Sequence, residues 1–441
     1  MYPTFLFLNI GGDFLSIAQR IKEAGYPIFF YKSKGQAKGR EDSGIGIFDK
    51  KEMVDDFYEI INKIPPEQLI ILIDDNSLGD EMDFLKNQGY TVIGGSAFGD
   101  KIEYSRSLGT KLMRKIGLNV PDEHSFESIN DGIKFLEGQT EDARFVFKPD
   151  GDEFAGSSKT YTGRNKQDLL DYMEWIKTNS EEKHYTIKKF LLQEFIEGIE
   201  ADFSAYFNGY DFMEGSICID IEEKKSADGN KGEATGCMGN ILMFVEKSKY
   251  FTEYISKLAP ALRNVNYIGQ ISINNIFAYG NGKYKEGQPY GLEFTPRFGW
   301  DAHLTELAIM QDAGIAPCEF YIALANQEPF DFPHGKVGCG IRVYSGSVNL
   351  KKDDVSGRIM SFPSSIEKNL WFYSISKKND KYIIEDNPVT VVNTVGKNLK
   401  KTIEECYSMT KKINLPDPYY RMEIGQRADK VLKFLRKFNW V

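Results

Sequence analysis

Along the first hundred residues, short apolar runs alternate with segments whose apolar residues recur at helical spacing. The opening run, residues 5–10, is followed by Gly11 and Gly12 and then by a helical pattern over residues 14–24. The alternation continues, with apolar runs at 26–31, 68–73 and 91–93 and helical patterns at 51–63 and 78–88. Strands that alternate with helices predict a parallel, doubly wound sheet, so an α/β fold is expected.

The rest of the chain continues with less regular alternation. Between residues 100 and 295 the pattern predicts a helix that starts at Asp100 and ends at 116, strands at 145–147, 190–195, 269–279 and 290–295, and helices at 166–178 and 251–265. Beyond about residue 330 strands dominate, at 339–344, 370–374, 381–385 and 389–394, before helices at 397–413 and up to 437. This last part contains no nucleophile and base arrangement of its own, and we expect it to pack over a cleft formed by the preceding residues.

Composition limits the class of partner. The chain has 441 residues, of which 41% are hydrophobic, enough for two or three domains. Its 55 basic and 64 acidic residues give a formal charge of -9, which argues against a general nucleic-acid or membrane-surface binder. We therefore expect small-molecule partners, no nucleic acid and no membrane, for a monomer or a homodimer.

Cysteines, histidines and the N-terminus exclude further classes. The five cysteines are scattered without CxxC spacing, so neither a disulfide framework nor a zinc site is indicated. The four histidines are not spaced as paired metal ligands. The N-terminal apolar run has no basic start and is too short to span a bilayer, so a cytoplasmic protein is expected.

The stretch KPDGDEFAGSSKT, residues 148–160, is the first candidate site. A lysine at the end of a strand can place positive charge on a polyphosphate, and glycines let backbone N–H groups approach it closely. Taken alone, the stretch is explained better by a polar β-hairpin turn, because the chain has 40 glycines. Gly11 and Gly12 at a helix N-terminus could also hold an anion, but a plain tight turn explains them about equally well.

Two later segments could supply the nucleotide and substrate contacts. The strand end at 193–196 offers main-chain groups to an adenine edge, and Glu200 lies far enough along to reach ribose hydroxyls. The glycine-rich segment 222–240 contains Lys224 and Lys225, which could bind an anionic substrate or a phosphoryl group. Taken alone, the first segment is explained more simply by an acidic hairpin and the second by a solvated surface loop.

The segment LEFTPRFGWD, residues 292–301, contains candidate metal and anion ligands. Glu293 on a strand can hold Mg²⁺, with phosphate oxygens and water completing the octahedron. Arg297 can neutralise a carboxylate or an acyl phosphate by a bidentate contact. A surface Glu–Arg pair is the commoner explanation in isolation.

Taken in order, these segments resemble the phosphoribosylamine–glycine ligase family of the ATP-grasp superfamily. The resemblance runs through nearly the whole chain and includes the opening GG, VIGGSAFGDKIEYSRSLGTKLMRKIGLNVP, KPDG, LLQEFIEGIEADFS, DGNKGEATGCMGN, LEFTPRFGWD and YYRMEIGQRA. The last segment is especially specific, because it lies outside the ATP site and is not shared by ATP-grasp enzymes at large. The implied domains are an N-terminal domain at 1–100, an ATP-grasp domain at 101–330 with a lid subdomain near 120–195, and a β-rich α+β domain at 331–441.

The resemblance also implies an activity, cofactors and site residues. ATP would phosphorylate a carboxylate, and an amine would displace the phosphate to form an amide, with Mg²⁺ or Mn²⁺ as the metal. The implied ATP-binding residues are Lys111 and Lys148, the loop residues Gly151, Gly156, Ser157 and Ser158, the adenine segment Gln193, Glu194, Phe195 and Ile196, and Glu200 at the ribose. The implied metal ligands are Glu293 and Thr295, the catalytic residues are Lys225, Arg297 and Asp228, and the substrate residues are Gly11, Gly12, Lys224, Thr235, Gly236 and Met238.

Departures from the family pattern concentrate at the substrate end. The ExN metal motif is Glu293-Phe-Thr295, GGRE is GGDF, GPE is replaced by IDDNS, and HKR is Glu223-Lys224-Lys225. The proline and asparagine before TGGMG are Glu233 and Ala234, and the second glycine of that motif is Cys237. Two hypotheses follow: a ligase that joins glycine to phosphoribosylamine or acts on another amine such as a different sugar or a nucleotide, and a non-catalytic ATP-binding descendant.

Overall fold

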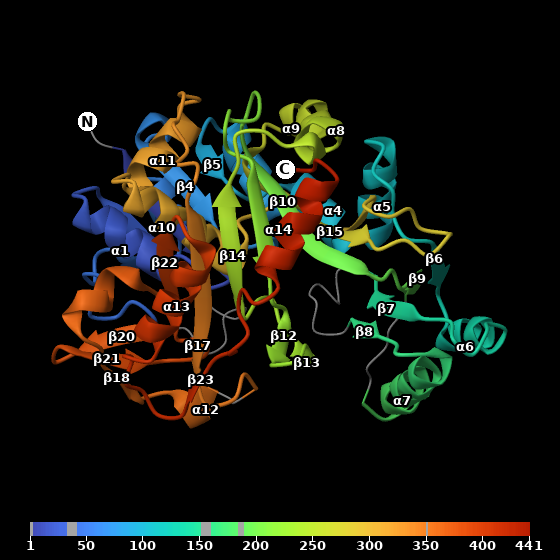
Figure 1. Cartoon of the computed structure of the whole chain (residues 1–441). Helices are drawn as coiled ribbons and strands as arrows, with labels where there is room; N and C mark the ends of the chain where they lie inside the picture. Colours follow the sequence, from blue (N-terminus) through green and yellow to red (C-terminus); the bar gives the residue numbers. More distant parts are fainter. Residues whose placement is uncertain (1–2, 33–41, 151–159, 184–188, 350–351) are drawn as a thin grey trace.

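The N-terminal residues form a parallel five-stranded sheet of order β3-β2-β1-β4-β5 (Figure 1). The computed structural model describes residues 3–32, 42–150, 160–183, 189–349 and 352–441. The elements of this first domain are β1 (Thr4–Asn9), α1 (Leu15–Glu23), β2 (Ile28–Lys32), β3 (Met53–Val54), α2 (Tyr58–Ile61), β4 (Leu69–Ile73), α3 (Gly79–Asn87) and β5 (Thr91–Ile93).

Alternation along β1 decides which helices cover which face of this sheet. Phe5 and Phe7 belong to the core that contains residues of α1, whereas Leu6 and Leu8 pack with residues of α2 and α3. Helices therefore cover both faces, and the doubly wound α/β prediction is confirmed.

A nine-stranded sheet forms the centre of the molecule. Its main path is β16-β15-β10-β11-β14-β17-β22-β19, and β23 pairs with β17. The strands are β10 (Gly198–Asn208), β11 (Cys218–Glu222), β14 (Gly239–Phe244), β15 (Ile268–Ala278), β16 (Pro289–Thr295), β17 (Val337–Ser345), β19 (Leu370–Phe372), β22 (Thr390–Gly396) and β23 (Pro418–Tyr419).

This sheet continues across the expected domain boundary at residues 330 and 331. β14 pairs antiparallel with β17, with Gly239 opposite Ile341 and Leu242 opposite Gly338. The helices around the sheet are α8 (Lys249–Glu253), α9 (Ala259–Asn264), α10 (Trp300–Asp312), α11 (Pro317–Ala325), α12 (Lys352–Val355), α13 (Leu399–Thr410) and α14 (Ala428–Lys437). The three-domain division stays a prediction.

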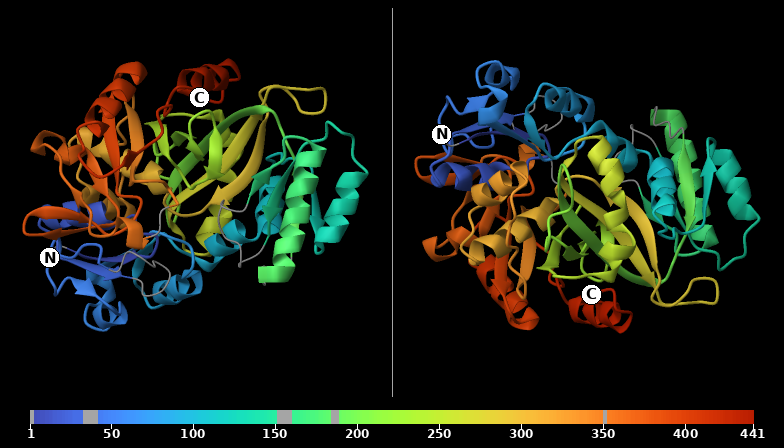
Figure 2. Two further views of the ribbon diagram at one scale, coloured as in Figure 1. Left: turned by 90° about the horizontal axis from the view of Figure 1, so that it is seen from below. Right: turned by 90° about the horizontal axis from the view of Figure 1, so that it is seen from above.

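A separate four-stranded sheet of order β6-β9-β7-β8 projects from the opposite side to the N-terminal sheet (Figures 1 and 2). It packs its apolar face on two helices around Phe147 and Phe190. Its elements are β6 (Glu123–Phe126), α6 (Ile129–Glu137), β7 (Phe145–Pro149), β8 (Tyr161–Thr162), α7 (Lys166–Lys183) and β9 (Phe190–Glu194). Two smaller sheets consist of β12 (Lys225–Ala227) with β13 (Lys231–Ala234), and of β18 (Ile359–Met360), β20 (Ile375–Lys378) and β21 (Lys381–Ile384).

Three of the predicted helices are wrong in extent. Residues 51–63 contain β3 and the short α2 instead of one helix, and residues 251–265 contain α8, a 3₁₀ turn and α9, where Pro260 lies at the helix start. The helix predicted from Asp100 to 116 is two helices, α4 (Ala97–Tyr104) and α5 (Arg106–Lys115), and Ser96 rather than Asp100 caps the first. The break at Ser105 matters for the site described below.

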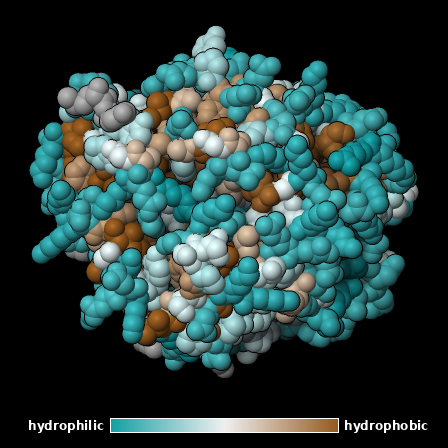
Figure 3. Space-filling model, turned by 60° about the vertical axis from the view of Figure 1, so that its left-hand side comes forward, coloured by the Kyte–Doolittle hydropathy of each residue, from teal (hydrophilic) through white to brown (hydrophobic). Residues whose placement is uncertain are grey.

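The surface shows mixed polar character. On the face in Figure 3 hydrophilic side chains predominate and hydrophobic ones are scattered. In the described parts of the chain no single helix is long and apolar enough to span a membrane. Helices α10 and α11 taken together have the length and apolar composition of a span, but they are bent by 107° relative to each other.

Candidate active site

One face of the nine-stranded sheet carries a row of polar side chains. Asn274 of β15 lies opposite Glu293 of β16 and also opposite Asp202 of β10, and Asp202 in turn lies opposite Asp220 of β11. The neighbouring apolar residue on β10, Phe203, points into the core on the other face. Strand alternation therefore brings acidic and amide groups from four strands to one surface.

A cavity of about 130 Å³ lies over this face. It is lined by α4 and α5, by the row of polar residues and by the segment that follows β16: Glu103, Tyr104, Arg106, Asp202, Ser204, Asp220, Glu222, Lys224, Gly236, Gln270, Ser272, Asn274, Glu293, Thr295, Arg297, Gly299, Trp300 and Ala302.

One end of the cavity is cationic around a single carboxylate. An Arg106 guanidinium nitrogen lies 2.9 Å from Glu293 Oε2, and the Asn274 amide donates to Glu293 Oε1 at 3.2 Å. Burial alone would raise the pKa of Glu293, but the charges of Arg106, Lys224 and Lys148 outweigh it and lower this pKa to about 2. Glu293 is therefore ionised at neutral pH.

Lys148 lies buried at the end of β7, with 7% of its surface exposed. Burial, together with the charge of Arg106, lowers the pKa of Lys148 to about 8, while Glu293 opposes the change. A buried lysine beside an arginine is poorly compensated, and an anionic ligand between them would restore the balance of charge.

A second arginine lies across the cavity. Arg297 donates to Glu103 Oε1 at 3.0 Å and lies 5.3 Å from the centre of the Trp300 ring. The Trp300 ring also fills the space beside Gly236, where an added Cβ would come within 1.4 Å of a ring carbon. Only glycine therefore fits at position 236.

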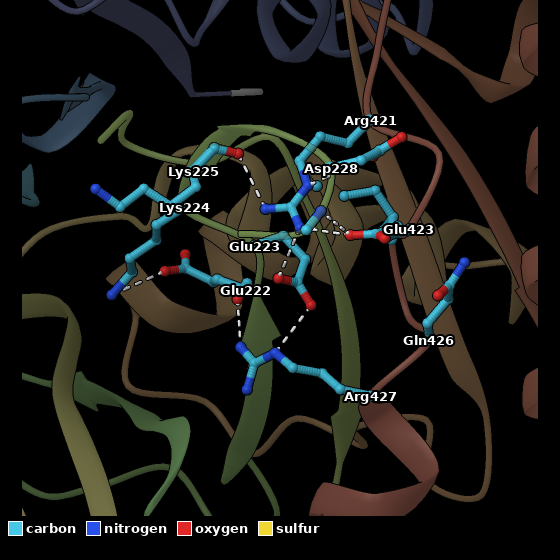
Figure 4. A network of polar contacts seen from close by, with 12 residues as sticks. Glu222, Glu223, Lys224, Lys225, Asp228, Arg421, Glu423, Gln426 and Arg427 are labelled. Atoms are coloured by element: carbon cyan, nitrogen blue, oxygen red, sulfur yellow. Dashed lines mark hydrogen bonds and ion pairs between the residues drawn. The ribbon is translucent and has the colours of Figure 1, made fainter. Parts of the chain in front are cut away.

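The C-terminal segment contacts the residues on either side of Lys224, a further cation of the cavity (Figure 4). Arg427 donates to Glu223 Oε1 at 2.9 Å, and Arg421 donates to the Lys225 carbonyl at 3.0 Å. Lys224 itself points to the carboxylate of Glu222, at 3.4 Å. The tail thus packs against the segment that contributes Lys224 to the cavity, and no described residue after Ala302 is among those that line it.

Comparison with known proteins agrees with this geometry. Residues 104–299 match the family model described as phosphoribosylglycinamide synthetase, ATP-grasp (A) domain. Residues 104–299 of this chain, a little less than half of it, are therefore similar to the ATP-grasp domain of phosphoribosylglycinamide synthetases. Across the chain, the phosphoribosylamine–glycine ligase of Lactococcus lactis is 23% identical and covers 96% of this chain and 99% of its own, and that of Leptospira interrogans is 21% identical and covers 92% and 96%.

Solved structures support the ATP-grasp fold over the full length. The phosphoribosylamine–glycine ligase of Thermotoga maritima superposes with a TM-score of 0.66 at 17% identity, covering 96% of this chain and all of its own. The biotin carboxylase domain of a Hydrogenobacter thermophilus 2-oxoglutarate carboxylase, described in complex with MgADP and bicarbonate, gives 0.64 at 12% identity, covering 99% and 98%. These two likenesses show that the chain shares the fold of both structures.

The ATP-grasp cavity gathers some of the predicted site residues. Glu293, Thr295, Arg297, Lys224 and Gly236 line it, and Lys148 lies within electrostatic range of Glu293.

Other predicted residues lie outside the cavity lining. Asp228 accepts a hydrogen bond from the Met422 amide, Thr235 bonds the Lys224 carbonyl, Met238 is buried, and Lys111 is exposed on α5. Lys225 lies in β12 and Glu200 contacts Lys224 at 3.1 Å. Gly151, Gly156, Ser157 and Ser158 lie outside the described residues. The roles assigned to all of these stay predictions.

The predicted adenine segment lies at the end of β9 in the smaller sheet. Gln193 is buried between β6 and β7, and the amide of Phe195 donates to the Arg144 carbonyl at 3.0 Å. The Glu194 carboxylate accepts hydrogen bonds from Lys283 and Tyr284, which lie beyond β15. The segment therefore joins the two sheets, and adenine binding there stays a prediction.

Gly11 and Gly12 donate their amides to the carboxylate of Asp74. The two glycines thus serve an internal contact in this structure, and substrate binding by them stays a prediction.

Several cavity residues were missed from the sequence. Arg106 was passed over in favour of Lys111, although it directly follows Ser105 at the start of a helix. Asp202 and Asp220 alternate with apolar residues on strands that pair in register, which could have identified them once the strand pairing was known. Glu103 also lines the cavity, and no role was assigned to it from the sequence.

The metal ligands expected for the ATP-grasp domain fit in part. Glu293 supplies an ionised oxygen, and Thr295 supplies a hydroxyl on the same strand face. In the described part of the chain no group of three or more His, Cys, Asp or Glu side chains is placed to hold a metal ion. Mg²⁺ is commonly held by one or two carboxylates with phosphate oxygens and waters, so one carboxylate is a sufficient anchor here.

The placement of Arg106 gives a direct test of which cation binds phosphate. We expect Arg106→Ala to weaken ATP binding at least tenfold, because it removes a charge that lies against Glu293 in the cavity. Lys111→Ala on the same helix is expected to change it less than twofold, because Lys111 faces solvent. Calorimetric titration with ATP measures the affinity of both variants. A larger loss of affinity in Lys111→Ala than in Arg106→Ala would favour Lys111 as the phosphate-binding residue, as predicted from the sequence.

Proposed function

We propose that this chain is an ATP-dependent ligase that joins a carboxylate to an amine. The observation that carries the proposal is that Arg106 contacts the ionised Glu293 in a cavity that Arg297 also lines, while the buried Lys148 lies within electrostatic range of both Arg106 and Glu293. Such an arrangement suits a polyphosphate beside an acidic substrate.

The proposed reaction has two steps and uses no side-chain nucleophile. A carboxylate oxygen attacks the γ-phosphorus of ATP, the bond to the β-γ bridging oxygen breaks, and ADP leaves. The amine nitrogen then attacks the acyl carbon, the bond to the phosphoryl oxygen breaks, and phosphate leaves as the nitrogen loses a proton. The protein contributes positioning and charge neutralisation.

Residues in and around the cavity have these places in the scheme. Arg106 and Lys148 would hold the ATP phosphates, and Arg297 would bind the carboxylate and then the acyl phosphate. Lys225 and Asp228 retain their predicted roles near the transferred group. Glu293 and Thr295 would hold Mg²⁺ or Mn²⁺, which neutralises phosphate charge when bound.

A matrix of amino acids against amines tests the proposal. Each pair is incubated with ATP and magnesium, and ADP release and product mass are measured; glycine with phosphoribosylamine is one pair among them. ADP formation that requires both a carboxylate and an amine is the expected result. ATP binding without turnover for every pair would instead identify a non-catalytic descendant.

A further inference from the structure

The glycine loop after β1 does not have free amides for a substrate anion. The carboxylate of Asp74, at the end of β4, accepts hydrogen bonds from four consecutive backbone N–H groups: Ile10 at 2.7 Å, Gly11 at 3.0 Å, Gly12 at 2.9 Å and Asp13 at 2.9 Å. Consecutive amides of this kind form an anion-binding concavity, and here the protein supplies the anion itself. A substrate phosphate would have to displace this buried carboxylate from the amides, and the two negative charges would repel each other.

The surroundings of this loop are acidic as well. In the described part of the chain, Arg297 lies 3.0 Å from Glu103 and 3.8 Å from Asp75. Two carboxylates thus face one guanidinium among the described residues here, which disfavours a phosphorylated substrate on this side of the cavity.

The floor of the cavity holds two further buried carboxylates. Asp202 and Asp220 face each other across β10 and β11, line the cavity, and are 5% and 6% exposed. Oδ1 of each has no hydrogen-bond partner among the residues the structure describes. Buried carboxylate oxygens without a donor are costly, so they indicate a donor supplied by a ligand.

The nearby cation, Lys224, does not balance the charge of Asp202 and Asp220 on the cavity floor. Lys224 is shared among Glu200 at 3.1 Å, Glu222 at 3.4 Å and Asp202 at 3.8 Å. Burial raises the pKa of Asp202 and of Asp220 well above the ordinary range, because ionised carboxylates there lack compensation. The described carboxylates are not arranged as a metal site, so an ammonium group with its several N–H donors suits the floor better than a metal ion.

We propose that the amine substrate carries no phosphate and has a second, protonated amino group, which Asp202 and Asp220 bind. This inference rests on the ligase activity proposed above. The reacting amino group must be neutral to attack the acyl phosphate, whereas the second group stays charged and fixes the molecule on the cavity floor. The substrate class is thus a diamine, a polyamine or an unphosphorylated amine of similar charge.

Binding to the full-length protein tests this class without requiring turnover. Two matched probe pairs are titrated by calorimetry: 1,4-diaminobutane against 1-aminobutane, and glucosamine against glucosamine 6-phosphate. We expect the diamine to bind at least tenfold more tightly than the monoamine, and glucosamine more tightly than its phosphate. Equal binding within the first pair, no diamine binding, or tighter binding of the phosphorylated sugar would overturn the inference.

Variants of near-identical size test the assigned residues. Asp202→Asn and Asp220→Asn are each expected to reduce diamine affinity about tenfold and to leave ATP affinity unchanged. Asp211→Asn, at an exposed position beyond β10, is the matched control and is expected to change neither. Unchanged diamine affinity in folded Asp202→Asn and Asp220→Asn proteins would also contradict the assignment; if either fails to fold, the wild-type probe pairs still decide.

The two proposals can fail separately. Selective diamine binding with no ADP release for any substrate pair would leave the binding site standing and remove the ligase. ADP release with amines, but without preference for a second amino group, would leave the ligase standing and remove the site.

Discussion

Replacing Lys148 by alanine is expected to weaken ATP binding about 100-fold and to abolish ADP formation with any productive substrate pair. Lys148 is buried at the end of β7, where its charge and that of Arg106 both act on Glu293. A phosphate placed between them gains a charge-assisted contact in a site that excludes water, which is worth much more than a surface ion pair. Calorimetric titration with ATP, followed by an ADP assay, measures both effects.

The control for this variant is Lys115→Ala, which removes an exposed lysine from the last turn of α5. We expect its ATP affinity to stay within a factor of two of the wild type. Glu293→Ala removes the proposed metal ligand instead of a phosphate-binding cation. We expect this variant to fold and to form no ADP. ADP formation at the wild-type rate in both Lys148→Ala and Glu293→Ala would exclude the proposed active site.

Asp74→Ala is expected to destabilise the N-terminal domain by about 3 kcal/mol, because four backbone N–H groups lose their acceptor together. The amides of Ile10 and Gly12 lie in a buried environment, where water replaces the carboxylate poorly. Faster hydrogen exchange at residues 10–13 and a lower midpoint of denaturant unfolding are the two readouts.

Asp80→Ala is the matched control, since Asp80 is exposed in the first turn of α3. Its expected change is within 0.5 kcal/mol. If exchange at residues 10–13 stayed as slow in Asp74→Ala as in the wild type, the four hydrogen bonds would not be what fixes this loop.

The regular parts of the fold were predictable because their patterns are local. β5 was placed at Thr91–Ile93 as observed, since a short apolar run between polar segments leaves few alternatives. The break at Ser105 was not predictable in this way, because apolar spacing continues through it. The backbone N–H of Arg106 donates to Asp150 Oδ1 at 2.8 Å, a contact across 44 residues that starts a new helix.

In the candidate site, too, residues identified by a local pattern were predicted, and residues placed by contacts between distant segments were not. Glu293 and Arg297 were identified from one short segment, and both line the cavity. Arg106 was missed because its position depends on the break before α5, and Asp202 and Asp220 because their meeting depends on strand register. In the sequence, Asp74 stood out only as part of IDDNS, which replaces the GPE of the family pattern. Its hydrogen bonds to residues 10–13 depend on the parallel pairing of β1 and β4, which the sequence does not show.

The pairing of β14 with β17 constrains how this protein can be divided for experiments or by recombination. A chain ended near residue 330 would expose the whole edge of β14, with unpaired amides and carbonyls beside buried Ile241 and Leu242. Such a fragment would recruit other strands and aggregate rather than persist as an ATP-binding module. The C-terminal quarter is therefore expected to be inherited and expressed together with the rest, and a fusion partner is better attached at either terminus than inserted near residue 330.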